Sequence, residues 1–203
     1  MTSAKILVLC AAALMLAACA PAVNPTPTDF PTSPAPLIPT QASPATSQPS
    51  STPSLFELTS PAFAPEGVIP DRYSCKGEDI SPELTWGDPP AATRSLALIF
   101  DDPSGPWTHW VAYNLPPATR ALPESVLAGE NLPGGGSQGS NSWGALEYGG
   151  PCPPQGSTHR YVFALYALDT VLELKTGANK RELLAAMEGQ ILAKVELAAS
   201  FTR

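Results

Sequence analysis

The stretch that decides the fold is GGPCPPQGSTHRYVFALYALD, residues 149–169. It begins as a loop stiffened by glycine and proline and ends as an apolar run of strand length. Side chains of an extended strand alternate between two faces, so one face carries His159, Tyr161, Phe163 and Leu165. We therefore expect an imidazole and a phenol at the mouth of a loop, pointing the same way.

The chain has only one other histidine, His109, and it also stands at a junction between a loop and a predicted strand. The sequence THWVAYNL predicts a strand over residues 108–115. Alternation puts His109, Val111 and Tyr113 on one face, and Trp110, Ala112 and Asn114 on the other. Because imidazoles titrate near neutral pH and donate hydrogen bonds, the two histidines are the first candidates for functional side chains.

Short strand-like segments separated by proline and glycine recur through the rest of the chain from residue 55. The further predicted strands are 55–60, 68–69, 83–86, 95–100 and 191–201. One helix is predicted over 179–188, with Asn179 or Thr176 as its N-cap and Gly189 as its C-cap. Residues 123–148 are rich in glycine and predict a long loop. The pattern indicates a mainly β fold, an antiparallel β-sandwich with one or two peripheral helices.

The first 54 residues have a different character. Residues 1–18 combine one lysine with a short apolar run, which predicts a signal peptide. The sequence Leu16-Ala17-Ala18-Cys19 resembles the lipobox of bacterial lipoproteins, and this implies cleavage before Cys19 and a diacylglyceryl group on its sulfur. The alternative is an ordinary signal peptide with a chance cysteine.

Residues 19–54 comprise Cys19 and a segment dominated by proline, serine and threonine, which predicts a disordered tether leaning to polyproline II. An O-glycosylated stalk is the alternative for this segment. Residues 55–203 are enough for one well-buried domain. We therefore expect an exported protein, anchored to a membrane by lipid on the extracytoplasmic side, at the cell surface or in the periplasm.

The charge limits the kinds of partner that we expect, and the cysteine content limits the covalent bonds. The net charge is −7 and there is no basic patch, so nucleic acid is not an expected partner. Of four cysteines, Cys10 leaves with the signal and Cys19 would carry lipid. Cys75 and Cys152 remain and predict a disulfide in an exported protein, with two free thiols or a metal pair as alternatives.

Five motifs along residues 55–203 together resemble the phosphatidylethanolamine-binding protein family, in its bacterial Raf-kinase-inhibitor-like branch. In chain order they are Asp79-Ile80-Ser81-Pro82 with Leu84 and Trp86; Asp101-Asp102-Pro103 with His109-Trp110-Val111 and Asn114-Leu115-Pro116; Gln138-Gly139-Ser140-Asn141; Tyr148-Gly149-Gly150-Pro151-Cys152-Pro153-Pro154; and Gly156 with His159-Arg160-Tyr161. The resemblance implies a β-sandwich of two antiparallel sheets with a small anion-binding cavity near the surface.

By the same resemblance, seven residues would form the cavity: Asp102, Trp107, His109, Pro153, Pro154, His159 and Tyr161. Asp79 and Ser81 belong to a motif expected to border it. The chain departs from the family pattern after Pro103, where about three residues, including a carboxylate and a proline of the usual rim, are missing. The departure implies a cavity that is wider or differently gated.

These residues favour a non-enzymatic binding or regulatory module for phosphate or a phosphoethanolamine head group, without a cofactor. The resemblance adds inhibition of a kinase- or protease-type partner as a further role. Three alternatives stay open: a structural lipoprotein with a vestigial cavity, a metal site on Asp102, His109 and His159, and a hydrolase using Ser140 or Ser157, for which no Gly-x-Ser-x-Gly elbow is present. Arg160 is expected in a structural ion pair, and Trp86, Trp110 and Trp143 in packing.

Overall fold

The computed structural model describes residues 55–203. The predicted signal peptide, the lipidated Cys19 and the tether lie outside the described residues. Within residues 55–203, no helix combines the length and apolar character needed to cross a membrane.

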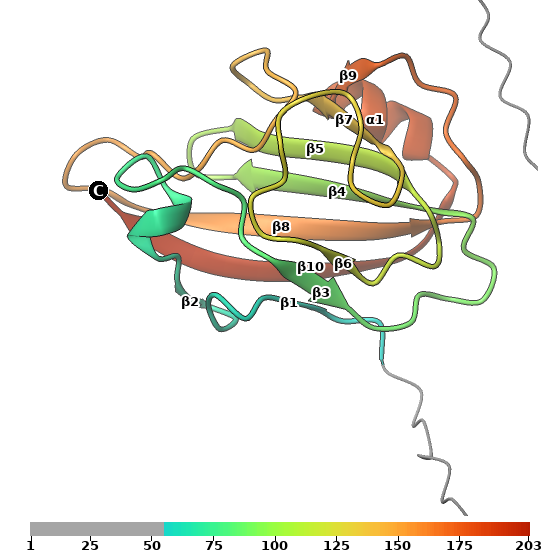
Figure 1. Ribbon diagram of the computed structural model, residues 1–203, viewed down its shortest axis with the longest axis horizontal. Helices are drawn as coiled ribbons and strands as arrows, with labels where there is room; N and C mark the ends of the chain where they lie inside the picture. Colours follow the sequence, from blue (N-terminus) through green and yellow to red (C-terminus); the bar gives the residue numbers. More distant parts are fainter. Residues whose placement is uncertain (1–54) are drawn as a thin grey trace, which may run out of the picture. The chain divides into compact units, whose positions relative to one another are not determined.

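Two β-sheets form the domain (Figure 1). The large sheet has the strand order β2-β10-β8-β4-β5-β7-β9, and the small sheet has the order β1-β3-β6. The large sheet consists of β2 (Gly67–Val68), β4 (Ser95–Asp102), β5 (Trp107–Leu115), β7 (Ser137–Ser140), β8 (Thr158–Leu168), β9 (Gly177–Asn179) and β10 (Ile191–Thr202). The small sheet consists of β1 (Leu58–Thr59), β3 (Leu84–Trp86) and β6 (Ala121–Leu122). A 3-10 turn (Asp71–Tyr73) and one helix, α1 (Lys180–Met187), complete the described elements.

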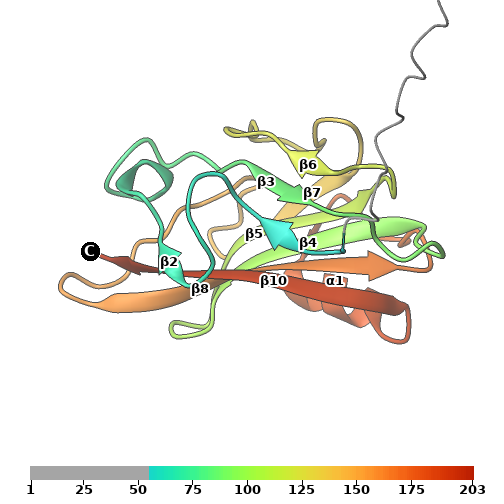
Figure 2. The ribbon, with the colours of Figure 1, turned by 90° about the horizontal axis from the view of Figure 1, so that it is seen from below.

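The large sheet buries both of its faces, which explains the uninterrupted apolar run of β4. On one face, Phe100 and Phe163 pack in the same cluster as Leu84 of the small sheet. On the other face, Val111 packs with Leu183 of α1. Figure 2 shows the small sheet and α1 on opposite sides of the large sheet. The predicted β-sandwich with a peripheral helix is therefore confirmed.

Helix α1 begins where the sequence predicts. Asn179 Oδ1 accepts a hydrogen bond from the backbone N–H of Glu182 (3.1 Å), and Glu182 Oε2 accepts one from the backbone N–H of Asn179 (2.9 Å). This reciprocal capping box satisfies two donors that the first turn leaves free. The C-cap is Glu188 and not the predicted Gly189, which follows it with a φ of +76°, a conformation that glycine adopts without strain.

The structure adds a strand where the sequence predicted only a loop. β7 lies within residues 123–148 and pairs antiparallel with β5, while its other side pairs parallel with β9. The short β2 also pairs parallel with β10, so the large sheet is antiparallel only in its centre. β7 escaped prediction because its buried anchor is polar. Gln138 accepts a hydrogen bond from Trp110 Nε1 at 2.7 Å and donates to the carbonyls of Leu127 and Gly129.

Strand β5 also departs from the predicted alternation. Phe100 pairs with Trp110, but the next residue of β4, Asp101, pairs with Thr108, so His109 is an extra residue in a β-bulge. The ring of His109 therefore packs against Phe100, on the small-sheet face, and not on the α1 face with Val111. The prediction that put His109 on the same face as Val111 and Tyr113 is wrong at this residue.

A second register shift in β5 falls near its end, where Asn114 has a φ of +56°. The Asn114 amide donates to the backbone carbonyl of Leu172 (2.9 Å) and accepts from its N–H (2.8 Å). Leu172 belongs to the apolar cluster under α1, so the grouping of Asn114 with Trp110 and Ala112 is also wrong.

Candidate functional site

One pocket of about 760 Å³ lies at the end of the large sheet where β4 ends and β8 begins. Figure 1 shows this end of the sheet, with the turn from β4 to β5 and the loop that leads into β8. All seven residues that the sequence predicts for a cavity line the pocket: Asp102, Trp107, His109, Pro153, Pro154, His159 and Tyr161. The geometric prediction that the two imidazoles and the phenol converge is therefore correct.

Asp102 holds His159 in place. His159 Nδ1 lies 2.6 Å from Asp102 Oδ2, and the other carboxylate oxygen accepts the backbone N–H groups of Ser104 (2.8 Å) and Gly105 (3.1 Å). The segment after Pro103 thus closes as a turn around this carboxylate. Because Asp102 is 5% exposed and both its oxygens are engaged, it orients the imidazole rather than offering itself to a ligand. Nε2 of His159 stays available to the pocket.

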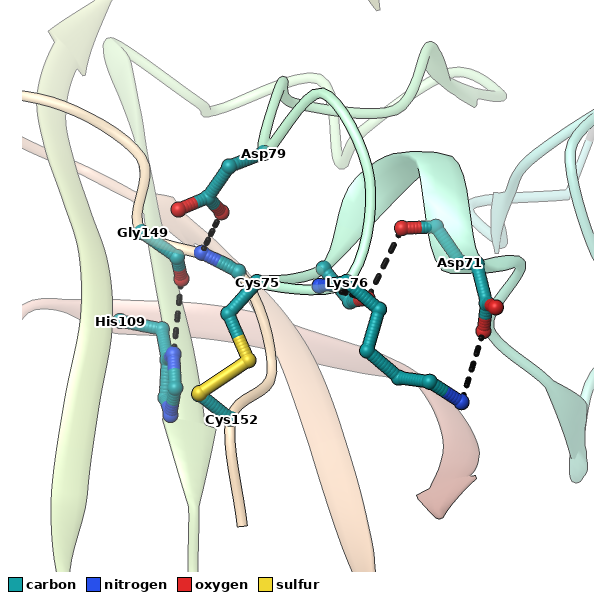
Figure 3. The surroundings of a disulfide bond; sticks show 9 residues. Asp71, Cys75, Lys76, Asp79, His109, Gly149 and Cys152 are labelled. Atoms are coloured by element: carbon teal, nitrogen blue, oxygen red, sulfur yellow. Dashed lines mark hydrogen bonds and ion pairs between the residues drawn. A yellow bond between two sulfur atoms is a disulfide. The ribbon is translucent and has the colours of Figure 1, made fainter. Parts of the chain in front are cut away.

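His109 is oriented by a backbone carbonyl. Its Nδ1 donates to the Gly149 oxygen at 2.7 Å, and the Gly149 N–H donates back to the His109 carbonyl at 3.0 Å (Figure 3). Burial lowers the pKa of His109, and the hydrogen bond to Gly149 opposes this only in part. The neutral ring therefore carries its proton on Nδ1, and Nε2 becomes a donor to the pocket only when the ring is protonated.

Tyr161 stands between the two imidazoles, with ring centroids 5.3 Å from His109 and 6.4 Å from His159. Its hydroxyl is buried and makes no hydrogen bond within residues 55–203. Burial, and then the Asp102 carboxylate, raise the pKa of Tyr161, while the nearby backbone N–H of Cys152 acts in the opposite direction. The hydroxyl therefore stays protonated. Leaving such a donor without a partner costs about 1–3 kcal/mol, which a ligand oxygen would recover.

A covalent link closes one wall of the pocket. Cys75 and Cys152 form the predicted disulfide, so the alternatives of free thiols and a metal pair are wrong. Around it, Gly150 N–H donates to Asp79 Oδ1 at 2.7 Å (Figure 3). Cys75 N–H donates to the Pro151 carbonyl at 3.2 Å. A side chain at position 150 would stand only 2.4 Å from Asp79 Oδ1, which accounts for the glycine.

The mouth of the pocket contains residues that sequence reasoning missed or misplaced. Trp143, predicted to pack, is 53% exposed and meets Trp107 (40% exposed) edge to face, with ring centroids 5.3 Å apart. Trp143 and Glu147 both line the pocket, as does Asp79, which the sequence placed at its border. A tryptophan in a glycine-rich segment without strand pattern was the available signal for Trp143.

Other predicted residues lie away from the pocket. Ser81 does not line it, because this residue is buried and its Oγ accepts the backbone N–H of Val126 at 2.9 Å. Arg160 forms the expected structural ion pair, with Glu66 at 2.6 Å. Trp86 and Trp110 are buried in packing, as predicted. Neither Ser140 nor Ser157, the serines considered as nucleophiles, lines the pocket.

The charges of the pocket are unusual for an anion site. Three carboxylates line it, those of Asp79, Asp102 and Glu147, and the lining holds no lysine or arginine. Within residues 55–203, no three histidine, cysteine or acidic side chains gather closely enough to hold a metal ion. In the described residues, Asp102, His109 and His159 therefore do not form the metal-binding arrangement that the sequence left open. The pocket residues offer a hydroxyl donor and two imidazoles, which donate from Nε2 when protonated, beside negative charge.

Comparison with known proteins gives the family. The family model of the phosphatidylethanolamine-binding protein matches residues 59–202. The chain belongs to this family. A "UPF0098 protein" of Methanothermobacter thermautotrophicus is 51% identical over 151 residues, covering 73% of this chain and 99% of that protein.

Two solved structures of the phosphatidylethanolamine-binding protein family share the fold of this chain. A homologue from Chlamydia trachomatis has a TM-score of 0.66 and 41% identity, covering 73% of this chain and 97% of that chain. Escherichia coli YbcL, described as a new member of the mammalian family, has a TM-score of 0.66 and 27% identity, covering 73% and 98% of the two chains. The predicted family membership is confirmed.

Proposed function

We propose that the domain is a non-enzymatic binding module whose pocket holds a phosphoryl group that carries an ammonium group, as in the phosphoethanolamine head group. The observation that carries the proposal is the buried, unpartnered hydroxyl of Tyr161 between two imidazoles with free Nε2 atoms. The hydroxyl would donate to phosphoryl oxygens, and so would Nε2 of each imidazole once its ring is protonated, since Nδ1 of each ring is already engaged. The family name, which refers to phosphatidylethanolamine, supports the same class of ligand.

The carboxylates favour a zwitterion over a simple anion. Inorganic phosphate would meet repulsion from Asp79, Asp102 and Glu147, with no lysine or arginine in the lining to offset it. An ammonium group on the same ligand would pair with the exposed carboxylates at positions 79 and 147. A volume of about 760 Å³ also leaves room for more than a phosphate ion. We therefore expect phosphoethanolamine to bind more tightly than phosphate.

Calorimetric titration of the full chain with phosphoethanolamine tests the proposal. His159→Ala removes one donor and should weaken binding by roughly tenfold or more, since a hydrogen bond to a charged group contributes about 1.5–3 kcal/mol. Arg160→Ala is the matched control, because Arg160 is adjacent in sequence but pairs with Glu66 outside the pocket. Equal affinity of wild type and His159→Ala would contradict the assignment of His159 as a ligand-binding residue. No binding by wild type would favour a vestigial cavity.

We also propose that Cys19 carries a lipid that anchors the domain to the extracytoplasmic side of a membrane. The lipobox-like sequence Leu16-Ala17-Ala18-Cys19 supports this, as does the Cys75–Cys152 disulfide, a bond typical of exported proteins. Labelled palmitate should enter the wild-type chain in bacterial cells and should be absent from Cys19→Ala. Equal labelling of the two chains would contradict the anchor, and so would a wild-type chain without label.

A further inference from the structure

We propose that the Cys75–Cys152 disulfide is a site of thiol–disulfide exchange, and that its reduction by a dithiol loosens the pocket wall and weakens ligand binding. The effect on ligand rests on the proposed function, whereas the loosening of the wall does not. Both cysteines line the pocket, and both are exposed residues that a reductant can approach.

The disulfide fixes a part of the pocket wall that few hydrogen bonds hold. Residues 149–157 form a loop that lines one wall of the pocket. Hydrogen bonds fix this loop up to residue 151: Gly149 to His109, Gly150 to Asp79, and the Pro151 carbonyl to Cys75. The next backbone bond of the loop is at the Pro154 carbonyl, which accepts the N–H of Ser157 at 2.9 Å.

Between these points, Cys152 and Pro153 are held by the disulfide and by packing. The two prolines, Pro153 and Pro154, cannot supply backbone donors of their own. The disulfide therefore fixes the part of the loop that lines the pocket.

Both the lining and the donors of the pocket depend on this segment. Pro153 and Pro154 form the lining on this side of the pocket. The backbone N–H of Cys152 lies beside the Tyr161 hydroxyl and acts to lower the pKa of that group. The same loop presents the Gly149 carbonyl that sets the tautomer of His109 (Figure 3). Loosening the segment therefore disturbs a wall and the surroundings of the donors at once.

The exchange balances without any further reactant. A thiolate of the dithiol attacks one sulfur, which forms a mixed disulfide and releases the other cysteine as a thiolate that takes up a proton. The second thiol of the reductant then displaces the remaining cysteine. The protein gains two electrons and two protons as the Cys75 and Cys152 thiols, and the dithiol becomes its own disulfide. The pairing of β8 with β10 and of β5 with β4 does not involve the disulfide, so the strands that carry His159, Tyr161 and His109 should keep their ladders.

The experiment uses the full chain with Cys10→Ser and Cys19→Ser, so that only Cys75 and Cys152 carry thiols. The oxidised and dithiothreitol-reduced forms are compared, with complete reduction verified by two titratable thiols. Hydrogen exchange of backbone amides in residues 149–157 should accelerate at least roughly tenfold on reduction, while β4 and β8 stay protected. Unchanged hydrogen exchange would overturn the proposal. Loss of protection throughout the sheet would also overturn it, because the disulfide would then stabilise the whole domain and not the pocket wall in particular.

The second readout is affinity for phosphoethanolamine. The reduced form should bind roughly tenfold more weakly, reoxidation should restore the affinity, and Cys75→Ser/Cys152→Ser should bind weakly whether or not dithiothreitol is present. Equal affinity of oxidised and reduced protein would overturn the coupling. If the oxidised protein binds no phosphoethanolamine, the proposed function fails, and the exchange measurement alone decides whether the wall is redox-controlled.

Discussion

At the scale of single residues, Tyr161 illustrates how a binding site conflicts with stability. Its hydroxyl is buried without a partner in the described chain. Without a ligand, the folded domain is therefore less stable with tyrosine at this position than it would be with phenylalanine. Tyr113 offers a contrast, because its hydroxyl is also on a buried residue but donates to the Lys175 carbonyl at 3.0 Å. The two tyrosines should therefore respond in opposite ways to the same substitution.

Tyr161→Phe should raise the free energy of unfolding by about 1 kcal/mol, because it removes an unsatisfied polar group, and should weaken phosphoethanolamine binding roughly tenfold. Tyr113→Phe should lower the free energy of unfolding by about 1 kcal/mol and leave binding unchanged, because it removes a satisfied hydrogen bond on the α1 side. Urea unfolding and calorimetry measure both quantities. A Tyr161→Phe protein that binds as tightly as wild type would show that this hydroxyl does not contact the ligand.

At the scale of elements, regularity decides what a sequence can predict. β8 pairs without a break against β10 from Thr158 to Ala167, so its alternation correctly placed His159, Tyr161 and Phe163 on one face. β5 contains a bulge, and strict alternation of side chains cannot predict where one extra residue is inserted into a strand. His109 reaches the pocket because of that bulge. The sequence identified the residue through its motif and gave it the wrong face.

Other elements escaped prediction because polar groups or a loop determine them. β7 is held by the hydrogen bonds of Gln138, which carry no hydrophobic signal, and the exposed Trp143 follows in a segment without periodicity. Helix α1, by contrast, was predicted to within one residue at each end, because its apolar spacing and its capping sequence agree. Local chemistry that repeats can be predicted, and tertiary contacts between loops cannot.

The cap of α1 gives a prediction at this scale. Asn179→Ala removes the side-chain half of the capping box and should lower the free energy of unfolding by about 1 kcal/mol. Affinity for phosphoethanolamine should not change, because α1 packs on the opposite face of the large sheet from Tyr161. Chemical denaturation and calorimetry on the same samples check both statements. A loss of binding in this variant would mean that the two faces are coupled through the sheet.

At the scale of the whole molecule, burial of His109 should make folding stability depend on pH. Burial lowers the pKa of His109 in the folded domain, so the unfolded chain binds more protons once the pH falls below about 6.5. This contribution is therefore complete above that pH and is lost as the pH falls toward the lowered pKa. Glu66, whose pKa is lowered by Arg160, would act only at more acidic pH, and it is fully exposed. Between pH 7.5 and 5, His109 should dominate.

His109→Asn is the matched variant, because an amide can still donate to the Gly149 carbonyl but does not titrate. Wild type should lose up to about 1.4 kcal/mol of stability between pH 7.5 and 5 for each unit by which the pKa of His109 is lowered, and His109→Asn should lose less. Phosphoethanolamine should reverse the trend in wild type, because phosphoryl oxygens favour the imidazolium that donates from Nε2. The stabilisation it gives, measured by thermal unfolding, should therefore grow on acidification relative to His109→Asn. Parallel pH profiles for the two proteins, with and without ligand, would mean that the buried imidazole takes up no proton on binding.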